Sequence, residues 1–121
     1  MQRRNRLTAS VDFLSVRRRG RSFACPLLVL HARPTEGLPL RLGVSVGKQF
    51  GPAVARNRFK RRIREIVRHR LDLLAPGWDL VFVARSGGKG ASFAELESAA
   101  EGTLSRAGVL MALGKGPGDG T

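Results

Sequence analysis

The sequence predicts an α+β fold, a sandwich in which helices pack against one face of a mixed β-sheet. Three patterns lead to this prediction. Apolar residues recur in steps of three and four across residues 53–74, which is typical of an amphipathic helix. They alternate with small or polar residues at 40–47, and they are continuous at 80–83. The last two patterns indicate a half-buried strand and a fully buried strand.

A short helix is expected near the start of the chain, at residues 8–16. Ser10 can cap this helix, and Asp12 adds negative charge to its first turn, where the helix dipole favours it. Gly20 follows a run of three arginines and is expected to stop the helical region.

Two or three strands should follow this helix. The apolar run within residues 23–32 indicates a buried strand, and a short extra strand is expected near Ser22. Residues 33–39 contain two prolines and a glycine and are expected to form a loop. The strand at 40–47 has one aliphatic face. Its other face is small and polar, and it either leaves room for another group or is simply solvated.

The second half of the chain predicts a long helix, a strand and a last helix. The long helix should end before Pro76-Gly77, and the continuous apolar run predicts a strand at 79–85. Residues 86–91 form a glycine-rich loop, after which Ser92 and Glu95 have the spacing of a capping box. The inward stripe of the last helix is expected to consist of Phe93, Leu96, Ala100, Leu104 and Ala107.

Length and composition indicate one folded domain. The chain has 121 residues, of which 42% are hydrophobic. We expect residues 1–113 to form a single domain and residues 114–121 a disordered tail. The single cysteine cannot form an internal disulfide, which excludes a disulfide-stapled module. No uncharged run approaches the length of a membrane span, and no apolar stretch precedes Asp12, so a cytoplasmic protein is expected.

Positive charge is concentrated in the first part of the chain. The net charge is +13, and residues 1–70 hold 18 basic and three acidic residues. Residues 71–121 hold four basic and six acidic residues. A solubility device would not need this asymmetry, whereas a face that binds a polyanion would. Most of the basic residues are arginines. The planar guanidinium group of arginine suits the binding of phosphate and can stack on bases.

The strongest concentration lies in the long predicted helix. Residues 56–70 hold eight basic residues and one acidic residue. Ion pairs within the helix cannot neutralise a run of nearly one sign, so a merely solvated face is the weaker explanation. The charge pattern therefore predicts nucleic-acid binding, with RNA favoured over DNA. The same helix carries a narrow apolar face made of Phe59, Ile63, Ile66 and Val67.

Several short motifs occur in order along the chain. Arg56-Asn57-Arg58 is followed by Lys60-Arg61 and Arg64-Glu65, and it is preceded by Val44-Ser45-Val46-Gly47-Lys48 and by Asp12-Phe13. With these blocks at matching spacing, the sequence resembles the bacterial ribonuclease P protein component. The resemblance covers roughly residues 6–110.

This resemblance implies a fold and a function. It implies the order α-β-β-β-α-β-α around a four-stranded sheet, as in the second domain of a small-subunit ribosomal protein, with a left-handed β-α-β crossover. The implied role is that of the protein subunit of ribonuclease P, a ribonucleoprotein endonuclease that removes the 5′ leader from precursor tRNA. Hydrolysis would be performed by the RNA subunit, with Mg²⁺ bound mainly by that RNA. The isolated protein is not expected to be catalytic.

The resemblance also implies which residues bind RNA. The protein would bind the catalytic RNA and the single-stranded leader, and it would thereby broaden and strengthen substrate binding. The implied contacts with the catalytic RNA are Arg56, Asn57, Arg58, Lys60, Arg61 and Arg64. The implied leader-binding cleft, between the first helix and the sheet, is lined by Phe13, Arg17, His31, Ser45 and Lys48. Relatives often have an aromatic residue where Arg17 and His31 stand.

Simpler explanations exist for some of these residues. Phe13 is also explained as a core residue, His31 as a hydrogen-bonded histidine of the sheet, and Lys48 as a surface lysine. A ribosomal protein of similar fold, without enzymatic function, would share the charge and the fold class. A DNA-binding basic helix is disfavoured, because such a helix lacks the apolar stripe seen here.

No protein-bound metal is expected. His31, His69 and Cys25 lie far apart in the sequence and match no zinc spacing. The carboxylates are few and scattered, which disfavours a nuclease that holds two metal ions with protein ligands.

Overall fold

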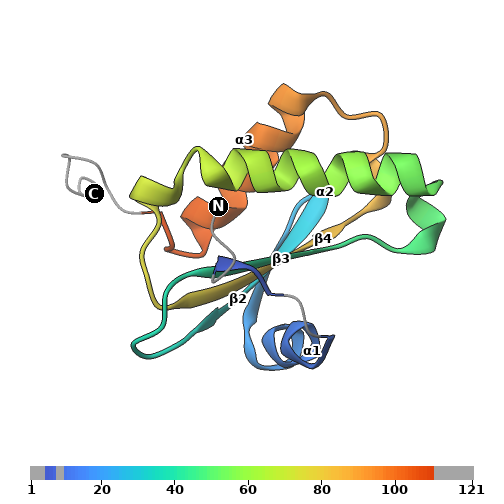
Figure 1. Cartoon of the computed structure of the whole chain (residues 1–121). Helices are drawn as coiled ribbons and strands as arrows, with labels where there is room; N and C mark the ends of the chain where they lie inside the picture. The colour runs from blue at the N-terminus through green and yellow to red at the C-terminus, as the bar shows by residue number, and fades with distance from the viewer. Residues whose placement is uncertain (1–4, 8–9, 111–121) are drawn as a thin grey trace.

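The computed structural model of the chain describes residues 5–7 and 10–110. In this part of the chain, one four-stranded sheet is combined with three α-helices (Figure 1). The elements are α1 (Ser10–Arg19), β1 (Arg21–Ala24), β2 (Leu28–Pro34), β3 (Arg41–Ser45), α2 (Ala53–Arg68), β4 (Trp78–Ala84) and α3 (Phe93–Arg106), with short 3₁₀ turns η2 (Lys48–Phe50), η3 (Leu71–Leu73) and η4 (Ser86–Gly88). The predicted α+β class and the predicted order of elements are confirmed.

The sheet is mixed, with the strand order β1-β2-β4-β3. β2 pairs antiparallel with both β1 and β4, whereas β3 and β4 are parallel. α2 therefore forms the crossover between two neighbouring parallel strands. The short extra strand expected near Ser22 is present as β1, which splits the single strand predicted at 23–32 into two.

The helices cover both faces of the sheet. α2 and α3 lie on one face, and α1 lies on the other (Figure 1). The prediction that helices pack against one face only was therefore wrong. The physical reason is the central strand β4, in which Val81 and Phe82 are both fully buried although they point to opposite faces. A strand that is apolar on both faces needs a cover on each of them.

The larger core lies between the sheet and the pair α2 and α3. It takes the apolar stripe of α2 as predicted, and it takes Leu96, Ala100 and Leu104 from α3. The capping box of Ser92 and Glu95 is formed at the start of α3. The prediction that Phe93 belongs to the inward stripe of α3 is wrong, because this side chain is 38% exposed.

Truncation of the α2 stripe should destabilise the fold. Ile63→Ala and Phe59→Ala are each expected to lower the free energy of unfolding by about 2–5 kcal/mol, because both side chains are buried and would leave cavities. Urea unfolding measures the loss. Val54→Ala, which shortens an exposed side chain of the same helix, is the control and should change stability by less than about 0.5 kcal/mol. Equal midpoints for Ile63→Ala and Val54→Ala would contradict the prediction.

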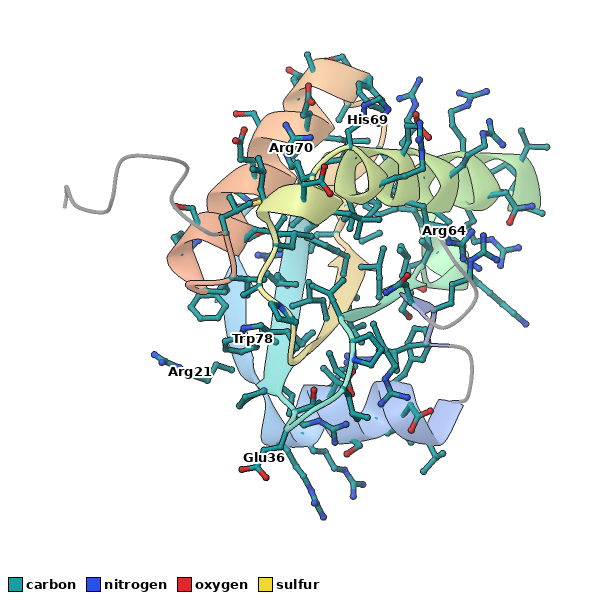
Figure 2. All side chains as sticks on the ribbon, turned by 60° about the vertical axis from the view of Figure 1, so that its left-hand side comes forward. Arg21, Glu36, Arg64, His69, Arg70 and Trp78 are labelled. Carbon is teal, nitrogen blue, oxygen red and sulfur yellow. The ribbon has the colours of Figure 1, made fainter. Side chains whose placement is uncertain are left out.

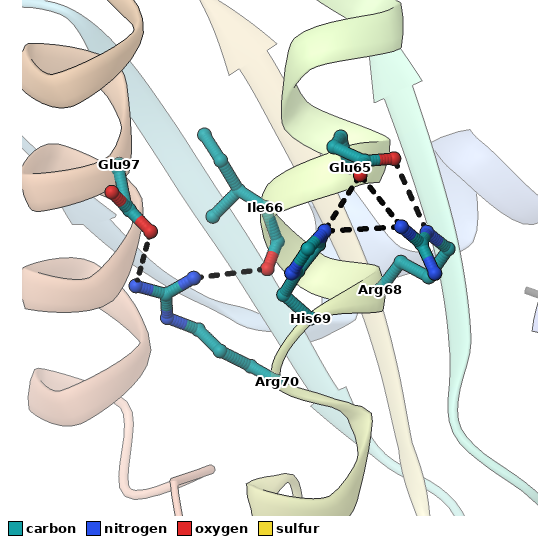
Figure 3. A network of polar contacts seen from close by, with 6 residues as sticks. All are labelled: Glu65, Ile66, Arg68, His69, Arg70 and Glu97. Carbon is teal, nitrogen blue, oxygen red and sulfur yellow. Dashed lines mark hydrogen bonds and ion pairs between the residues drawn. The ribbon is translucent and has the colours of Figure 1, made fainter.

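α2 ends at Arg68, earlier than the predicted boundary at residue 74. At Arg70 the backbone bond pattern changes, because its N–H bonds to the carbonyl of Val67, 2.9 Å away, three residues back instead of four. The tighter η3 turn keeps Leu74 against the core, so the apolar spacing continues beyond the helix. The Arg70 guanidinium donates to the Ile66 carbonyl and to Glu97 of α3, 2.8 Å away (Figure 3). This contact fastens the end of α2 to α3.

α1 runs further than predicted, to Arg19, and begins at Ser10 in the described residues. Gly20 stops it as expected. A Cβ on Gly20 would lie 2.7 Å from the carbonyl oxygen of Ala32, so the close approach of the chain to β2 requires a glycine there. The expected disordered tail, residues 114–121, lies outside the described residues. Among the described helices, none has the length and hydropathy of a membrane span.

Candidate nucleic-acid interface

α2 presents its charged side to solvent because its apolar side is buried. Next to this charged side lies a hollow of about 430 Å³, which we call the α2 groove. Figure 2 shows Arg64 on the side of α2 that points away from α3. The groove is lined by Arg6, Asn57, Lys60, Arg61, Arg64, Glu65 and Arg68. It therefore brings together four of the six predicted contacts with the catalytic RNA.

Arg6 belongs to the groove although it precedes the first residue of α2, Ala53, by 47 positions in the sequence. The N–H of Leu7 donates to the Leu42 carbonyl at 2.8 Å, and the Asn5 side-chain amide donates to the Leu40 carbonyl at 2.7 Å. These bonds pair the N-terminal segment with the outer edge of β3. Sequence reasoning missed Arg6, since no local pattern indicates this pairing.

The groove concentrates positive charge that carboxylates do not neutralise. Within residues 5–7 and 10–110, none of Arg6, Lys60, Arg61 and Arg64 forms an ion pair with a carboxylate. Partial burial lowers the pKa of the Arg64 guanidinium, and the nearby charge of Arg6 lowers it further. Like charges held together by the backbone favour the binding of an anion between them.

The one acidic residue of the groove is already paired. Glu65 accepts hydrogen bonds from Arg68 at 2.7 Å and contacts the His69 ring at 2.6 Å (Figure 3). The bonds from Arg68 and then His69 lower the pKa of Glu65 to about 2. Glu65 therefore stays ionised near neutral pH and offsets the charge of Arg68, which was not among the predicted contacts.

The remaining two predicted contacts point elsewhere. Arg56 donates from Nε to the Gly51 carbonyl at 3.1 Å, at the start of α2. Arg58 lies on the opposite flank of the helix and lines a second hollow together with Arg62. The structure thus places the six predicted residues at three separate positions along and around α2.

The face of the sheet under α1 holds two of the five predicted leader-binding residues, His31 and Ser45. His31 of β2, Gly43 of β3 and Val81 of β4 form one row across the strands, and Val29, Ser45 and Val83 form the next row. Phe13 reaches this face from α1. A Cβ on Gly43 would lie 2.5 Å from the Phe13 ring, so the small residue of β3 makes room for the aromatic side chain. Phe13 is half-buried and packs against the smaller core, as its interpretation as a core residue predicted, and its role in leader binding stays a prediction.

The exposure of the remaining predicted cleft residues, and of Ser45 and His31 on the face itself, varies. Arg17 is exposed on α1, and Ser45 is half-buried near the end of β3. Lys48 is exposed in the η2 turn beyond β3. His31 is half-buried, and its buried Nδ1 has no hydrogen-bond partner among the described residues. The interpretation of His31 as a hydrogen-bonded sheet histidine is therefore wrong for Nδ1.

The fold should lose stability when His31 is protonated. Burial lowers the pKa of His31, and the charge of Arg17 lowers it further. The unfolded chain therefore binds the proton more readily, so this contribution to stability is complete above the ordinary histidine pKa of 6.5 and declines as the pH falls below it. His31→Phe should flatten the dependence between about pH 7 and pH 5. Urea unfolding at both pH values measures the free energy of unfolding. An equal change of this free energy between the two pH values in the wild type and in His31→Phe would refute the prediction.

A buried carboxylate organises the opposite end of the same sheet face. Asp79 of β4 is fully buried and accepts hydrogen bonds from Arg33 at 2.7 Å and from Arg41 at 2.8 Å. Burial alone would raise the pKa of Asp79, but the bonds from Arg41 and Arg33 outweigh burial and lower it. Arg33 also donates to the Ser15 hydroxyl of α1. The Asp79 cluster therefore sets the position of α1 over the sheet, and sequence reasoning missed it.

The amino-acid sequence of the chain matches the model of a protein family. The family model described as Ribonuclease P matches residues 1–108. The chain belongs to the ribonuclease P protein family. Two ribonuclease P protein components illustrate the relationship. That of Herpetosiphon aurantiacus is 41% identical over 107 residues, which cover 88% of this chain and 87% of the relative. That of Roseiflexus sp. strain RS-1 is 40% identical over 120 residues, which cover 98% of both chains.

Solved structures of ribonuclease P proteins share the fold. The Staphylococcus aureus protein at 2.0 Å superposes with a TM-score of 0.82 and 29% identity, covering 88% of this chain and 97% of that one. The Thermotoga maritima protein superposes with a TM-score of 0.77 and 30% identity, covering 85% and 97%. Membership of this family assigns the chain to a tRNA-processing ribonucleoprotein with ribonuclease P RNA as its partner. The alternative of a ribosomal protein is therefore wrong.

Within the described residues, no group of three or more histidine, cysteine, aspartate or glutamate side chains is arranged to hold a metal ion. Several carboxylates have other partners. Asp79 binds two arginines, Glu65 binds Arg68 and His69, and Glu97 binds Arg70.

Proposed function

We propose that residues 1–113 act as a single RNA-binding domain that grips ribonuclease P RNA through the α2 groove and its neighbouring cations. The observation that carries this proposal is the set of four cations around one hollow that form no ion pair with any carboxylate of residues 5–7 and 10–110: Arg6, Lys60, Arg61 and Arg64. Phosphates of a folded RNA would enter the groove and replace the counterions that such a surface otherwise attracts. The Asn57 amide can both donate to and accept from the RNA.

The proposal assigns the single-stranded leader of precursor tRNA to the α1 face of the sheet. Phe13 offers a ring on which an unpaired base can stack, and stacking of this kind tolerates any base sequence. The exposed cations Arg17 and Lys48 lie where they could follow the leader backbone. Since α1 and α2 cover opposite faces of the sheet, the two RNA ligands would not compete for one surface.

In this proposal the RNA subunit performs the hydrolysis, with Mg²⁺ bound mainly by that RNA. The protein contributes binding and charge neutralisation in the cytoplasm, and the isolated chain does not cleave precursor tRNA. The ion pairs of Asp79, Glu65 and Glu97 support this assignment. These carboxylates neutralise arginines of the protein itself, so they are not free to bind a metal ion for hydrolysis.

Reconstitution with a bacterial ribonuclease P RNA tests the proposal. The protein should raise the rate of precursor tRNA cleavage at low Mg²⁺ concentration, because its cations neutralise phosphates that otherwise require counterions. The protein alone, freed of RNA, should show no cleavage. Cleavage by the protein alone, or an RNA-catalysed rate that the protein leaves unchanged, would refute the proposal.

Leader binding has its own test. The double variant Arg17→Gln with Lys48→Gln should weaken holoenzyme binding of precursor tRNA about tenfold, since two phosphate contacts are lost. It should leave binding of tRNA without a leader unchanged. Arg18→Gln with Arg19→Gln removes the same charge from neighbouring exposed positions of α1 and serves as the control. Equal losses for both substrates would place these cations outside the leader site.

A further inference from the structure

The sheet has one outer strand with an open edge. In the order β1-β2-β4-β3, the outer strands are β1 and β3. The N-terminal segment runs along β3, where the N–H of Leu7 donates to the Leu42 carbonyl. Within residues 5–7 and 10–110, β1 pairs only with β2, so no strand covers its outer side. An open edge of this kind is a template for an additional strand.

The backbone groups on the open edge belong to Ser22 and Ala24. Cys25 donates its N–H to the Leu28 carbonyl at 2.9 Å, at the turn between β1 and β2. Since backbone bonds alternate along an antiparallel strand, the polar groups of Ser22 and Ala24 point away from β2. The Ala24 carbonyl agrees with this direction, because it accepts a hydrogen bond from the Arg106 side chain of α3 at 2.9 Å.

Two cations flank the open edge on the α3 side of the sheet. The guanidiniums of Arg21 and Arg106 lie 5.7 and 5.9 Å from the centroid of the half-buried Phe23 ring. Figure 2 shows Arg21 pointing away from the sheet. In the part of the chain that the structure describes, neither arginine forms an ion pair with a carboxylate. An acidic side chain beside this edge would therefore meet two cations that are not neutralised.

A shallow hollow continues from the end of β1. It encloses about 490 Å³ between the turn after β1, the glycine-rich loop after β4 and α3, and we call it the α3 groove. Its two charged residues, Lys89 and Glu95, have opposite signs. The rest of its lining is small or apolar and includes Cys25, Pro26, Leu27, Ala91 and Ala99. The α3 groove therefore suits an apolar side chain better than a phosphate.

We propose that β1 and the α3 groove bind an extended segment of a partner protein, which adds a fifth strand antiparallel to β1. The segment would form backbone hydrogen bonds with Ser22 and Ala24. Its residue opposite Cys25 would be apolar and enter the α3 groove, and its residue opposite Arg21 would be acidic. Since side chains alternate between the faces of a strand, a second apolar residue lies between these two, opposite Phe23. The expected motif is apolar-x-apolar-x-acidic.

A second copy of this chain and an RNA are the weaker occupants of the edge. Two copies paired through β1 would bring the arginines at positions 21 and 106 of both chains together, which is repulsive. RNA has no backbone amide to match the alternating donors and acceptors of a strand, and Glu95 would repel its phosphates. The proposed RNA sites lie beside α2 and under α1, so the outer edge of β1 stays free when both are filled.

A titration with designed peptides tests the mode of binding. The full chain, isotope-labelled for heteronuclear NMR, receives a capped peptide with the sequence threonine-leucine-threonine-valine-threonine-glutamate-threonine. The amide resonances of residues 22–25 and of Ser98 should shift. Methylation of the amide nitrogen of the threonine before glutamate removes a bond to Ser22 and should weaken binding about tenfold. Methylation of the valine nitrogen, which faces solvent, should not. Absence of binding by the unmodified peptide, or equal affinity of the two methylated peptides, would overturn the proposal.

A charge exchange tests the acidic position of the motif. Arg21→Glu should weaken binding of the glutamate peptide about tenfold, and it should bind a peptide with lysine in place of glutamate more tightly than the wild type does. Arg18→Glu makes the same change of charge at an exposed position of α1 and should leave both affinities near those of the wild type. Equal effects of the two variants would show a general charge effect and would refute the proposed register.

A further pair of variants tests the α3 groove against RNA binding. Ser98→Leu fills the groove and should abolish peptide binding, whereas Ser105→Leu adds the same side chain to an exposed position of α3 outside the groove and should not. Both replaced residues are exposed, so thermal melting should show that both variants are folded. Both should bind ribonuclease P RNA and precursor tRNA with wild-type affinity. Loss of RNA binding by Ser98→Leu alone would assign the groove to RNA and overturn the proposal. Failure of the wild-type chain to bind RNA would instead refute the proposed function.

Discussion

Replacement of Lys60, Arg61 and Arg64 together by glutamine is expected to weaken binding of ribonuclease P RNA on the order of a hundredfold near physiological salt. These side chains line the α2 groove, and none of them is paired with a carboxylate among the described residues. Their loss should also reduce the slope of log affinity against log salt by about 2 to 3, since each phosphate contact contributes about 0.7–0.9. Filter binding over a series of salt concentrations measures both effects.

The control for this variant is a second set of three arginines. Arg18, Arg19 and Arg21 are exposed beside α1 and β1, so their replacement by glutamine changes the net charge equally. This control should lose less than about tenfold in affinity, because it alters the long-range field but no groove contact. Equal losses in the two variants would mean that net charge, and not the α2 groove, binds the RNA. Thermal melting should show that both variants remain folded, since no buried side chain is changed.

Asp79→Asn is expected to lower the free energy of unfolding by about 3 kcal/mol. The carboxylate is fully buried, and the change leaves the guanidiniums of Arg33 and Arg41 without their counter-charge. The expected loss is near the lower end for a broken buried pair, because these two side chains keep 21% and 26% exposure and can be partly solvated. Urea unfolding at neutral pH measures the loss.

The pH dependence of this effect has a definite sign. The pKa of Asp79 is lower in the folded chain than in the unfolded chain, so its contribution is complete above the ordinary carboxyl pKa of 3.8 and is lost as the pH falls below it. Asp79→Asn should therefore differ most from the wild type near neutral pH and least in strong acid. Asp72→Asn removes an exposed carboxylate and should change stability by less than about 0.5 kcal/mol. A wild-type unfolding midpoint for Asp79→Asn would contradict the role of the cluster.

Local patterns predicted most of the elements because they report local physics. The alternation at 40–47 reflects the period of a strand, and β3 occupies Arg41–Ser45 within it. The capping box of Ser92 and Glu95 marks the start of α3 because the two side chains satisfy nearby backbone N–H groups. Boundaries were less predictable. Leu74 continues the apolar spacing of α2 but is held by a 3₁₀ turn, which buries it equally well.

The candidate interface was predicted in composition and only partly in arrangement. The cationic character of α2 follows from the residue types alone, and so does the apolar stripe that holds the helix on the core. The distribution of the Arg56-Asn57-Arg58 motif around the helix does not follow from the residue types. Consecutive residues of a helix differ in direction by about 100°, so the neighbours Asn57 and Arg58 line hollows on opposite flanks of α2.

The amino-acid sequence by itself determined the order of helices and strands, the charged surface of α2 and the family to which the chain belongs, because each depends on residues close together or on their types. Only the tertiary structure decided which distant residues meet. Strand pairing brings Arg6 into the α2 groove and places Arg33 and Arg41 on Asp79. Burial of both faces of β4 places α1 opposite α2. These contacts depend on the register of strands and on the sharing of one core, which no short stretch of sequence specifies.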